Sequence, residues 1–213
     1  MKKFAVIGQP IKHSLSPRIH SEFAKELGID ISYEAIEVAP KDFNSVTKQL
    51  FENGYDGLNV TLPLKELAYS LSDEVSQAGR ESGAVNTLWK EKGKIFADST
   101  DGKGLIEDLL NNQISLKDSS LVILGAGGAA RSILPSVLSL QPKRLTLLNR
   151  TLEKSNALVD QFKARGVQIQ ALPMGEIPEG NLSGVINATS AGVIGEDLLL
   201  NQRIFKKADW SYD

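Results

Sequence analysis

The sequence predicts an α/β fold with two domains, and three observations support this prediction. Short apolar runs alternate with helix-like stretches along the chain, as in proteins whose sheets are mostly parallel. The length of 213 residues suits two domains of about 100 residues each. The alternation gives way to a polar stretch after residue 111 and starts again at residue 121. We expect a first domain at 1–101 and a second domain at 102–213.

The composition is that of an ordinary globular protein. Hydrophobic residues make up 41% of the chain, and the formal net charge is −2. This balance gives no basic field that would attract nucleic acid or an anionic membrane. The absence of cysteine excludes disulfides and thiolate chemistry. No group of His, Asp and Glu has metal-ligand spacing. The apolar runs are too short for a secretory signal or a membrane helix, so we expect a cytoplasmic protein.

The elements of the first half follow from periodicity. Apolar or alternating runs predict strands at 4–8, 33–38 and 57–61, and an antiparallel hairpin is predicted at 84–89 and 94–99. Residues 16–27 predict a helix with Ser16 as its N-cap. Its core face is predicted to consist of the apolar residues that recur every four positions, Ile19, Phe23 and Leu27.

The second half repeats the alternation. A helical stretch at 104–111 precedes predicted strands at 121–124, 145–149, 167–171 and 185–188, with helical stretches after the first two. This βαβαβ order is typical of half a Rossmann fold. Residues 206–213 have the pattern of a further strand, and their abrupt end suggests a fragment of a longer protein.

The string LVILGAGGAAR at 121–131 predicts a dinucleotide site. A buried strand leads into a glycine turn and then into a helix. Gly125 allows the tight turn, Gly127 allows the backbone to approach a pyrophosphate, and Ala130 allows close packing of the helix on the strand. The helix N-terminus offers free N–H groups to the phosphates. The cofactor residues predicted in this turn are Gly125, Ala126, Gly127, Gly128 and Ala129.

Four strings in the first half place polar side chains at strand ends and turns. They are HSLSP (13–17), NVTLPLK (59–65), GAVNT (83–87) and STDG (99–102). Hydroxyl and amide groups of this kind suit a small polyhydroxylated acid, and Lys65 with Asp101 could form an acid–base pair. The side chains that these strings supply are Ser14, Ser16, Asn59, Thr61, Lys65, Asn86, Thr87 and Asp101.

In their order and separations, these strings resemble those of the shikimate dehydrogenase family. The glycine turn, NRT (149–151) and NATSAG (187–192) extend the resemblance through the second half. The resemblance implies NADP-dependent, reversible reduction of 3-dehydroshikimate to shikimate in aromatic amino-acid biosynthesis. It also implies a substrate domain followed by a Rossmann-like NADP domain, as a monomer or a homodimer.

The same resemblance implies a role for each site residue. Ser14 and Ser16 would hold the substrate carboxylate. Lys65 would be the catalytic group that also contacts substrate, with Asp101 as its partner. The ring hydroxyls would be bound by Asn59, Thr61, Asn86 and Asp101.

The second strand of the predicted Rossmann unit bears on cofactor choice. An NAD site usually has an acidic residue at this strand end, whereas this chain has Asn149, Arg150 and Thr151. Arg150 can hold a 2′-phosphate through charge-assisted hydrogen bonds, and Lys154 adds a second positive charge. We therefore expect NADP. By resemblance, Thr189 and Gly192 would lie nearest to the nicotinamide.

Plainer interpretations stay open beside these. Lys65 could be a solvated lysine at a helix start, Asp101 a helix cap, and Arg150 a surface partner of Glu153. His13 and His20 are interpreted as ordinary polar residues.

The sequence departs from the family pattern at two places. Ser99 stands where the family usually has Asn, and the family continues past the pair matched by Tyr212 and Asp213 into a substrate-binding segment. The missing segment leaves open a truncated, weakly active or inactive homologue that binds NADP and shikimate. A quinate/shikimate dehydrogenase is a second alternative, as a close variant of the main function. The expected partners are small molecules, without nucleic acid or membrane.

Overall fold

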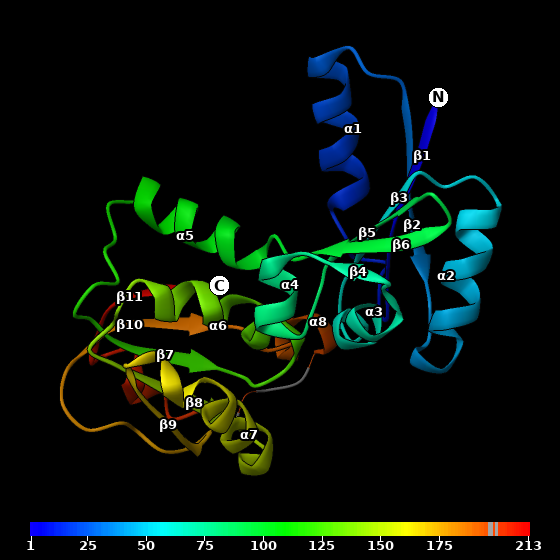
Figure 1. Ribbon diagram of the computed structural model, residues 1–213. Coiled ribbons are helices and arrows are strands. Elements are labelled where there is room, and N and C mark those ends of the chain that lie inside the picture. Colours follow the sequence, from blue (N-terminus) through cyan, green and yellow to red (C-terminus); the bar gives the residue numbers. More distant parts are fainter. Residues whose placement is uncertain (196–197, 199) are drawn as a thin grey trace. The chain divides into compact units, whose positions relative to one another are not determined.

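The computed structural model describes residues 1–195, 198 and 200–213. The chain divides into two compact units, 1–100 and 101–213, each built on its own sheet (Figure 1). The expected α/β class, with one mostly parallel sheet and one Rossmann-like sheet, is confirmed.

The first unit has six strands in the order β2-β1-β3-β5-β6-β4. β1 pairs in parallel with β2 and β3, and β5 and β6 form the expected antiparallel hairpin, with β5 antiparallel to β3. A further strand, β4, pairs in parallel with β6 and was not predicted from the sequence. The strand bounds are β1 Lys2–Gly8, β2 Ile31–Glu37, β3 Gly57–Val60, β4 Glu74–Val75, β5 Thr87–Glu91 and β6 Lys94–Asp98.

Four α-helices accompany this sheet, and Figure 1 shows α1 and α2 on opposite sides of it. Phe43, Leu50 and Phe51 of α2 are buried in one cluster with side chains of β1, β3 and β5. A short 3-10 helix at Pro40–Asp42 precedes α2. The helix bounds are α1 Ser16–Leu27, α2 Phe43–Glu52, α3 Lys65–Leu71 and α4 Gln77–Ser82.

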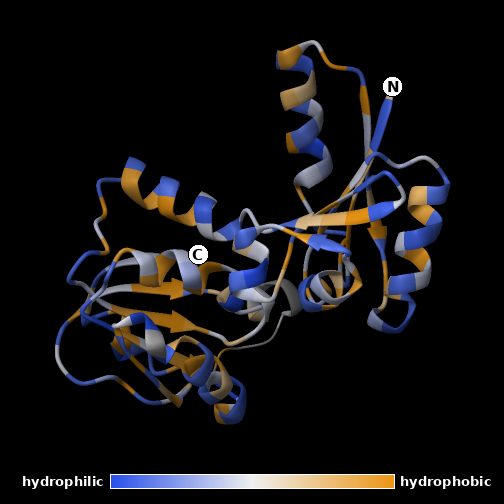
Figure 2. Ribbon diagram, viewed as in Figure 1, coloured by the Kyte–Doolittle hydropathy of each residue, from blue (hydrophilic) through white to orange (hydrophobic). Residues whose placement is uncertain are grey.

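Two predictions about α1 are wrong. The N-cap is Leu15 rather than Ser16, which is the first helical residue, and the N-cap side chain makes no capping hydrogen bond. The expected core face is exposed: Phe23 is 54% and Leu27 71% accessible, and Ile19 is also exposed. The buried residue of the helix is Ala24. The four-residue period identifies an apolar face, visible along α1 in Figure 2, but it does not identify the surface that covers that face.

Among its described residues, the second unit has five parallel strands in the order β11-β10-β7-β8-β9. All five strands were expected, and β10 begins three residues earlier than predicted. Figure 2 shows that the central strands are strongly apolar, as strands covered on both faces must be. The strand bounds are β7 Ser120–Leu124, β8 Arg144–Asn149, β9 Gln168–Pro173, β10 Leu182–Asn187 and β11 Ala208–Tyr212.

Three helices cover one face of this sheet. Figure 1 shows α5 beside α6, and side chains of both helices and of α7 share one buried cluster with β7, β8 and β10. The opposite face carries a smaller cluster that includes Val122, Leu148 and Ile204. The helix bounds are α5 Asp101–Asn111, α6 Gly128–Ser139, α7 Leu152–Phe162 and α8 Ala191–Ile194, with 3-10 turns at Lys163–Arg165 and Gln202–Ile204.

Candidate functional site

Polar residues of the first unit form a hydrogen-bonded group around the ends of β3 and β5. The Asn59 amide nitrogen donates to the carbonyl of Asn86 over 3.3 Å and to Thr87 Oγ1 over 3.4 Å. Thr87 Oγ1 in turn donates to Asn86 Oδ1 over 3.0 Å. The Asn86 amide then donates to Thr100 Oγ1 over 2.8 Å. The structure therefore brings Asn59 and Asn86, which are 27 residues apart in sequence, into one network.

Tyr33, which was not predicted from the sequence, extends the same network. Its hydroxyl donates to Asn59 Oδ1 over 2.6 Å, and the Ser16 side chain is close enough to affect its pKa. The Ser16 backbone N–H donates to Ser14 Oγ over 3.3 Å. Burial raises the pKa of Tyr33 to about 12, so the phenol keeps its proton near neutral pH. Tyr33 lies in a strand without a polar motif, and its alternating pattern gives no sign of this contact.

Main-chain hydrogen bonds place Lys65 and Thr61 next to this network. The Leu64 N–H donates to the Thr61 carbonyl over 2.9 Å, which closes a turn directly after β3. Lys65 begins α3 and is half-buried, and its carbonyl accepts from the Val85 N–H over 3.1 Å. The lysine is therefore anchored beside the residue that precedes Asn86. The position of Lys65 at a helix start agrees with its interpretation as a solvated lysine. The same position is also compatible with a catalytic role.

Asp101 is the first residue of α5 and belongs to the second unit. This position agrees with the interpretation of Asp101 as a helix cap, because an acidic side chain in the first turn interacts favourably with the helix dipole. The next residue, Gly102, faces α6 closely: a Cβ there would stand 2.9 Å from Ser136 Cβ and 3.2 Å from the Ser132 carbonyl oxygen. This contact fixes the start of α5, and with it the backbone of Asp101, against α6.

Three turns of the second unit lie at one edge of its sheet. Leu124 at the end of β7 pairs in register with Leu148 of β8 and with Asn187 of β10. Because the three strands are parallel, their carboxyl ends meet at the same edge, where α/β folds bind ligands. The turns at 125–128, 149–151 and 187–192 follow these three strand ends directly.

The glycine turn has the shape that an anion site needs. Gly125 has a φ of +101°, and α6 begins at Gly128 with Gly127 as its N-cap. A Cβ at Gly127 would meet no protein atom within 4 Å. The chain's own packing therefore does not require glycine there, whereas the close approach of a phosphate does. Ala126 and Ala130 are buried, and Ala129 is exposed.

The turn after β8 presents polar and basic groups. The Asn149 amide donates to the Thr151 carbonyl over 2.8 Å, and Thr151 is the N-cap of α7. The Lys154 N–H donates to the same carbonyl over 3.2 Å. Arg150, Thr151 and Lys154 have exposed side chains. The sequence analysis found no acidic residue at this strand end, and the structure places Arg150 directly after β8.

The turn after β10 is organised by Asn187, which the sequence analysis included in a motif but did not single out. Asn187 Oδ1 accepts from the Thr189 N–H over 3.1 Å and from Thr189 Oγ1 over 2.8 Å. The Asn187 amide nitrogen donates to Asp213 Oδ1 over 2.6 Å. Gly192 lies in α8, and a Cβ there would also meet no protein atom within 4 Å.

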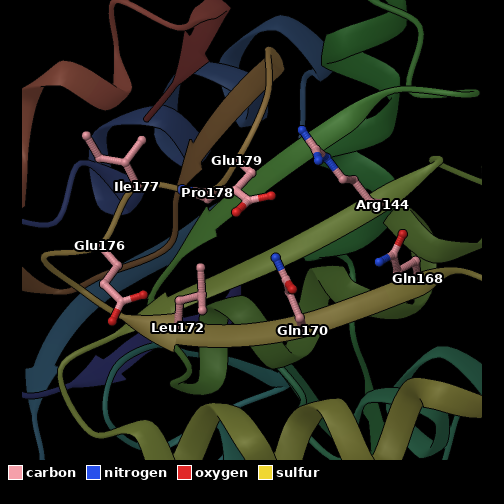
Figure 3. Close-up of a pocket in the computed structure, with 8 residues that line it drawn as sticks. All are labelled: Arg144, Gln168, Gln170, Leu172, Glu176, Ile177, Pro178 and Glu179. Atoms are coloured by element: carbon pink, nitrogen blue, oxygen red, sulfur yellow. The ribbon is translucent and has the colours of Figure 1, made fainter.

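A separate hollow lies elsewhere in the second unit (Figure 3). Its lining comes from Arg144 of β8, from Gln168, Gln170 and Leu172 of β9, and from the loop at 176–179. Gln170 also donates to Thr146 Oγ1 over 3.1 Å. None of the predicted cofactor residues lines this hollow, so it is distinct from the three turns.

Within residues 1–195, 198 and 200–213, no group of three or more His, Cys, Asp or Glu side chains could hold a metal ion. Over the same residues, no helix has the length and apolar character needed to cross a membrane.

Comparisons with known protein families match both units. Residues 6–88 match the family described as the shikimate dehydrogenase substrate binding domain. Residues 107–202 match the family described as shikimate / quinate 5-dehydrogenase.

Individual relatives agree with the family matches. The chain is 40% identical over 211 residues to a protein of Acinetobacter baumannii (strain ACICU) named shikimate dehydrogenase (NADP(+)), covering 97% of this chain and 80% of that protein. It is 42% identical over 213 residues to a protein of the same name from Legionella pneumophila (strain Corby), covering 100% and 78%.

A solved structure gives the same result at the level of the fold. The chain superimposes on shikimate 5-dehydrogenase from Thermus thermophilus, determined in complex with NADP(H) and shikimate, with a TM-score of 0.77 and 34% identity. The match covers 89% of this chain and 69% of that one.

Proposed function

Because the chain belongs to the shikimate dehydrogenase family, we propose that it catalyses the NADP-dependent, reversible reduction of 3-dehydroshikimate to shikimate. The observation that carries this proposal is the network joining Tyr33, Asn59 and Asn86, which gathers hydroxyl and amide groups suited to a small polyhydroxylated acid. The reaction and the cofactor in this proposal are taken from the names of the relatives described above.

We assign the substrate to polar groups of the first unit and, in one case, to Asp101. Ser14 and Ser16 bind the carboxylate, since hydroxyl donors two residues apart in the chain can hold its two oxygens. The ring hydroxyls are bound by Asn59, Thr61, Asn86 and Asp101, with Lys65 as a further contact. Support comes from the shared network and from the main-chain bonds that anchor the 61–65 turn.

The cofactor is assigned to the three turns of the second unit. NADPH, when bound, supplies the hydride that reduces the 3-keto group. The 125–129 turn and the start of α6 hold the pyrophosphate, and the open space at Gly127 fits this role. Asn149, Arg150, Thr151 and Lys154 hold the 2′-phosphate end. Thr189 and Gly192 lie at the nicotinamide end.

Lys65 and Asp101 are the proposed catalytic residues. As the keto carbon is reduced, negative charge develops on its oxygen. The Lys65 ammonium stabilises this charge and delivers the proton that completes the hydroxyl group, and it takes the proton back in the reverse direction. Asp101 is the proposed partner of Lys65 in this reaction, and its start-of-helix position is fixed by the contact of Gly102 with α6.

The test is reduction of NADP⁺ with shikimate, followed by the absorbance of NADPH. We expect turnover by the wild-type chain and a loss of about 10²- to 10⁴-fold in kcat for Lys65→Ala. Lys48→Ala, which removes an exposed lysine of α2, is the matched control and keeps full activity. A folded wild-type chain that shows no shikimate-dependent turnover contradicts the proposal.

We infer three further properties of the protein. A cytoplasmic location, a monomeric or dimeric state, and partners restricted to small molecules follow from composition and resemblance. Size-exclusion chromatography with light scattering measures the oligomeric state directly.

A further inference from the structure

Thr87 lies between the two asparagines assigned to the ring hydroxyls. Asn59 of β3 and Thr87 of β5 are directly opposite each other in the antiparallel pairing of these strands, so their side chains share one face of the sheet. The Thr87 hydroxyl accepts from the Asn59 amide nitrogen over 3.4 Å and donates to Asn86 Oδ1 over 3.0 Å. A single hydroxyl oxygen therefore links both amides, although Thr87 is not itself one of the assigned ligands.

The two hydrogen bonds of Thr87 differ in direction, and this difference fixes the orientation of both amides. A threonine hydroxyl has one proton, so it donates to one neighbour and accepts from the other. Its proton is directed at an oxygen of Asn86, and its lone pair faces the nitrogen of Asn59. If the Asn59 amide turned over, its oxygen would face that lone pair. If the Asn86 amide turned over, its nitrogen would meet the hydroxyl proton. Either reversal breaks a hydrogen bond.

Each asparagine consequently presents a different end to a ligand. The Asn59 nitrogen donates to the Asn86 carbonyl and to Thr87, whereas Asn59 Oδ1 accepts from the Tyr33 hydroxyl and has a second lone pair. Asn86 Oδ1 accepts twice, from Thr87 Oγ1 and from the Thr100 N–H over 3.2 Å. A ligand hydroxyl that meets Asn59 therefore meets an acceptor oxygen, and one that meets Asn86 meets a donor nitrogen.

An acceptor beside a donor matches two neighbouring hydroxyl groups of a ring. Each hydroxyl can both donate and accept, so one can donate to Asn59 Oδ1 while the other accepts from the Asn86 nitrogen. A ligand that carries only one of these hydroxyl groups cannot use both oriented amides. The orientation of the amides therefore contributes to selection between polyhydroxylated and simpler acids.

We propose that Thr87 is a positioning residue whose hydroxyl fixes the orientation of the Asn59 and Asn86 amides, so that together they recognise neighbouring hydroxyl groups of the substrate ring. This inference rests on the proposed function and deepens it, because it adds a specificity-determining residue that acts through two of the assigned ligands.

The first experiment compares Thr87→Val with wild-type protein. Valine keeps the branched shape of threonine and favours strands, so the variant removes the hydroxyl with little change in packing. We expect KM for shikimate to rise about 3- to 10-fold, the effect of losing one hydrogen-bonding group that serves both amides. The KM for NADP⁺ stays within about twofold. Thr47→Val is the matched control, because it makes the same substitution in α2, outside this network, and keeps the wild-type KM for shikimate.

A simpler ligand separates orientation of the amides from general damage to the site. The compound 3-hydroxycyclohex-1-ene-1-carboxylate keeps the carboxylate and the reacting hydroxyl of shikimate but lacks the other two ring hydroxyls. Its inhibition constant against shikimate stays within about twofold between wild type and Thr87→Val, because it has no pair of hydroxyl groups for the oriented amides. An unchanged KM for shikimate in Thr87→Val, or an equal loss of affinity for both compounds, overturns the inference.

Two further variants test the hydroxyl itself. Thr87→Ser keeps the hydroxyl, so its KM for shikimate stays within about twofold of wild type. A rise as large as that of Thr87→Val assigns the effect to the lost methyl group and overturns the inference. If Thr87→Val does not fold, Thr87→Ala removes the same hydroxyl and takes its place in each comparison.

A double-mutant cycle tests the coupling to Asn86. If Thr87 acts through this amide, the rise in KM for Thr87→Val combined with Asn86→Ala is smaller than the product of the two single effects. Effects that simply multiply overturn the inference.

The same measurements distinguish failure of this inference from failure of the proposed function. Wild-type protein that oxidises shikimate, with Thr87→Val having the same KM, overturns the inference alone. Folded wild-type protein that neither turns over nor binds shikimate overturns both.

Discussion

Gly125 and Ala188 lie so close together that a Cβ added to the glycine would stand 2.9 Å from the alanine carbonyl oxygen. Gly125 also has a φ of +101°, which side chains rarely adopt. We expect Gly125→Ala to lower the free energy of unfolding by about 1–3 kcal/mol, through strain and the displaced 188–189 backbone. Chemical denaturation measures this change. A variant as stable as wild type would contradict the close contact.

Gly127 lies only two residues away, but we expect its replacement by alanine to have little effect on the free energy of unfolding. A Cβ there enters open space, and the backbone is extended, with φ −89° and ψ −167°. Gly127→Ala should change the free energy of unfolding by less than about 1 kcal/mol, since alanine is a somewhat poorer N-cap than glycine. The affinity for NADPH should fall at least about tenfold, because the methyl group occupies the pyrophosphate position. Fluorescence titration with NADPH measures this affinity, and unchanged binding would place the pyrophosphate elsewhere.

Arg150 is expected to determine the preference for NADP over NAD. Charge-assisted hydrogen bonds to a 2′-phosphate contribute about 1.5–3 kcal/mol, so Arg150→Ala should raise the KM for NADP⁺ by about 10- to 100-fold. The KM for NAD⁺, which lacks the phosphate, should hardly change. Lys143→Ala is the control, because this exposed lysine precedes the opposite end of β8. Equal losses with both cofactors would assign Arg150 a structural role instead.

The sequence predicted the parts of the fold that depend on local pattern. The glycine turn, the strand ends and the helix at 16–27 each carry their signal in a few adjacent residues. Resemblance then placed Asn59 and Asn86 in the same site, and the structure shows the hydrogen bonds that join them.

Relationships between distant segments were beyond the sequence analysis. Tyr33 reaches Asn59 only through the pairing of β2 with β1 and of β1 with β3. The fit of Gly102 against Ser136 likewise depends on how α5 packs on α6. The helical period of Ile19 and Phe23 is clear from the sequence, but both side chains are exposed in the structure. The local sequence does not show which surface packs on them.

Thr47 is a buried hydroxyl residue whose replacement should stabilise the protein. It is 0% exposed, and its Oγ1 has no hydrogen-bond partner among the residues that the structure describes. Valine has nearly the same shape and a similar helix propensity, so Thr47→Val removes an unsatisfied hydroxyl at little packing cost. We expect the free energy of unfolding to rise by about 1 kcal/mol, seen as a higher urea midpoint at unchanged slope.

The matched control is Thr146→Val. Thr146 is equally buried at 1% exposure, but its Oγ1 accepts from Gln170. This variant should be no more stable than wild type, because it leaves the Gln170 donor without that partner. A destabilised Thr47→Val would mean that the hydroxyl has a partner such as a buried water.

His20 should make stability depend on pH in a defined direction. Burial lowers the pKa of this imidazole below its ordinary value of 6.5. The unfolded chain therefore binds the proton more tightly than the folded chain does. The contribution of His20 to stability is fully present above pH 6.5 and is lost as the pH falls from there towards the lower folded-state pKa. His20→Gln, which cannot titrate, should show a smaller fall in the free energy of unfolding between about pH 7.5 and pH 5.5. Denaturation of both proteins across this range measures the difference. If the free energy of unfolding of the wild type falls no more steeply with decreasing pH than that of the variant, the prediction is wrong. The His20 imidazole, stacked on Tyr33, would then bind its proton as readily in the folded chain as in the unfolded chain.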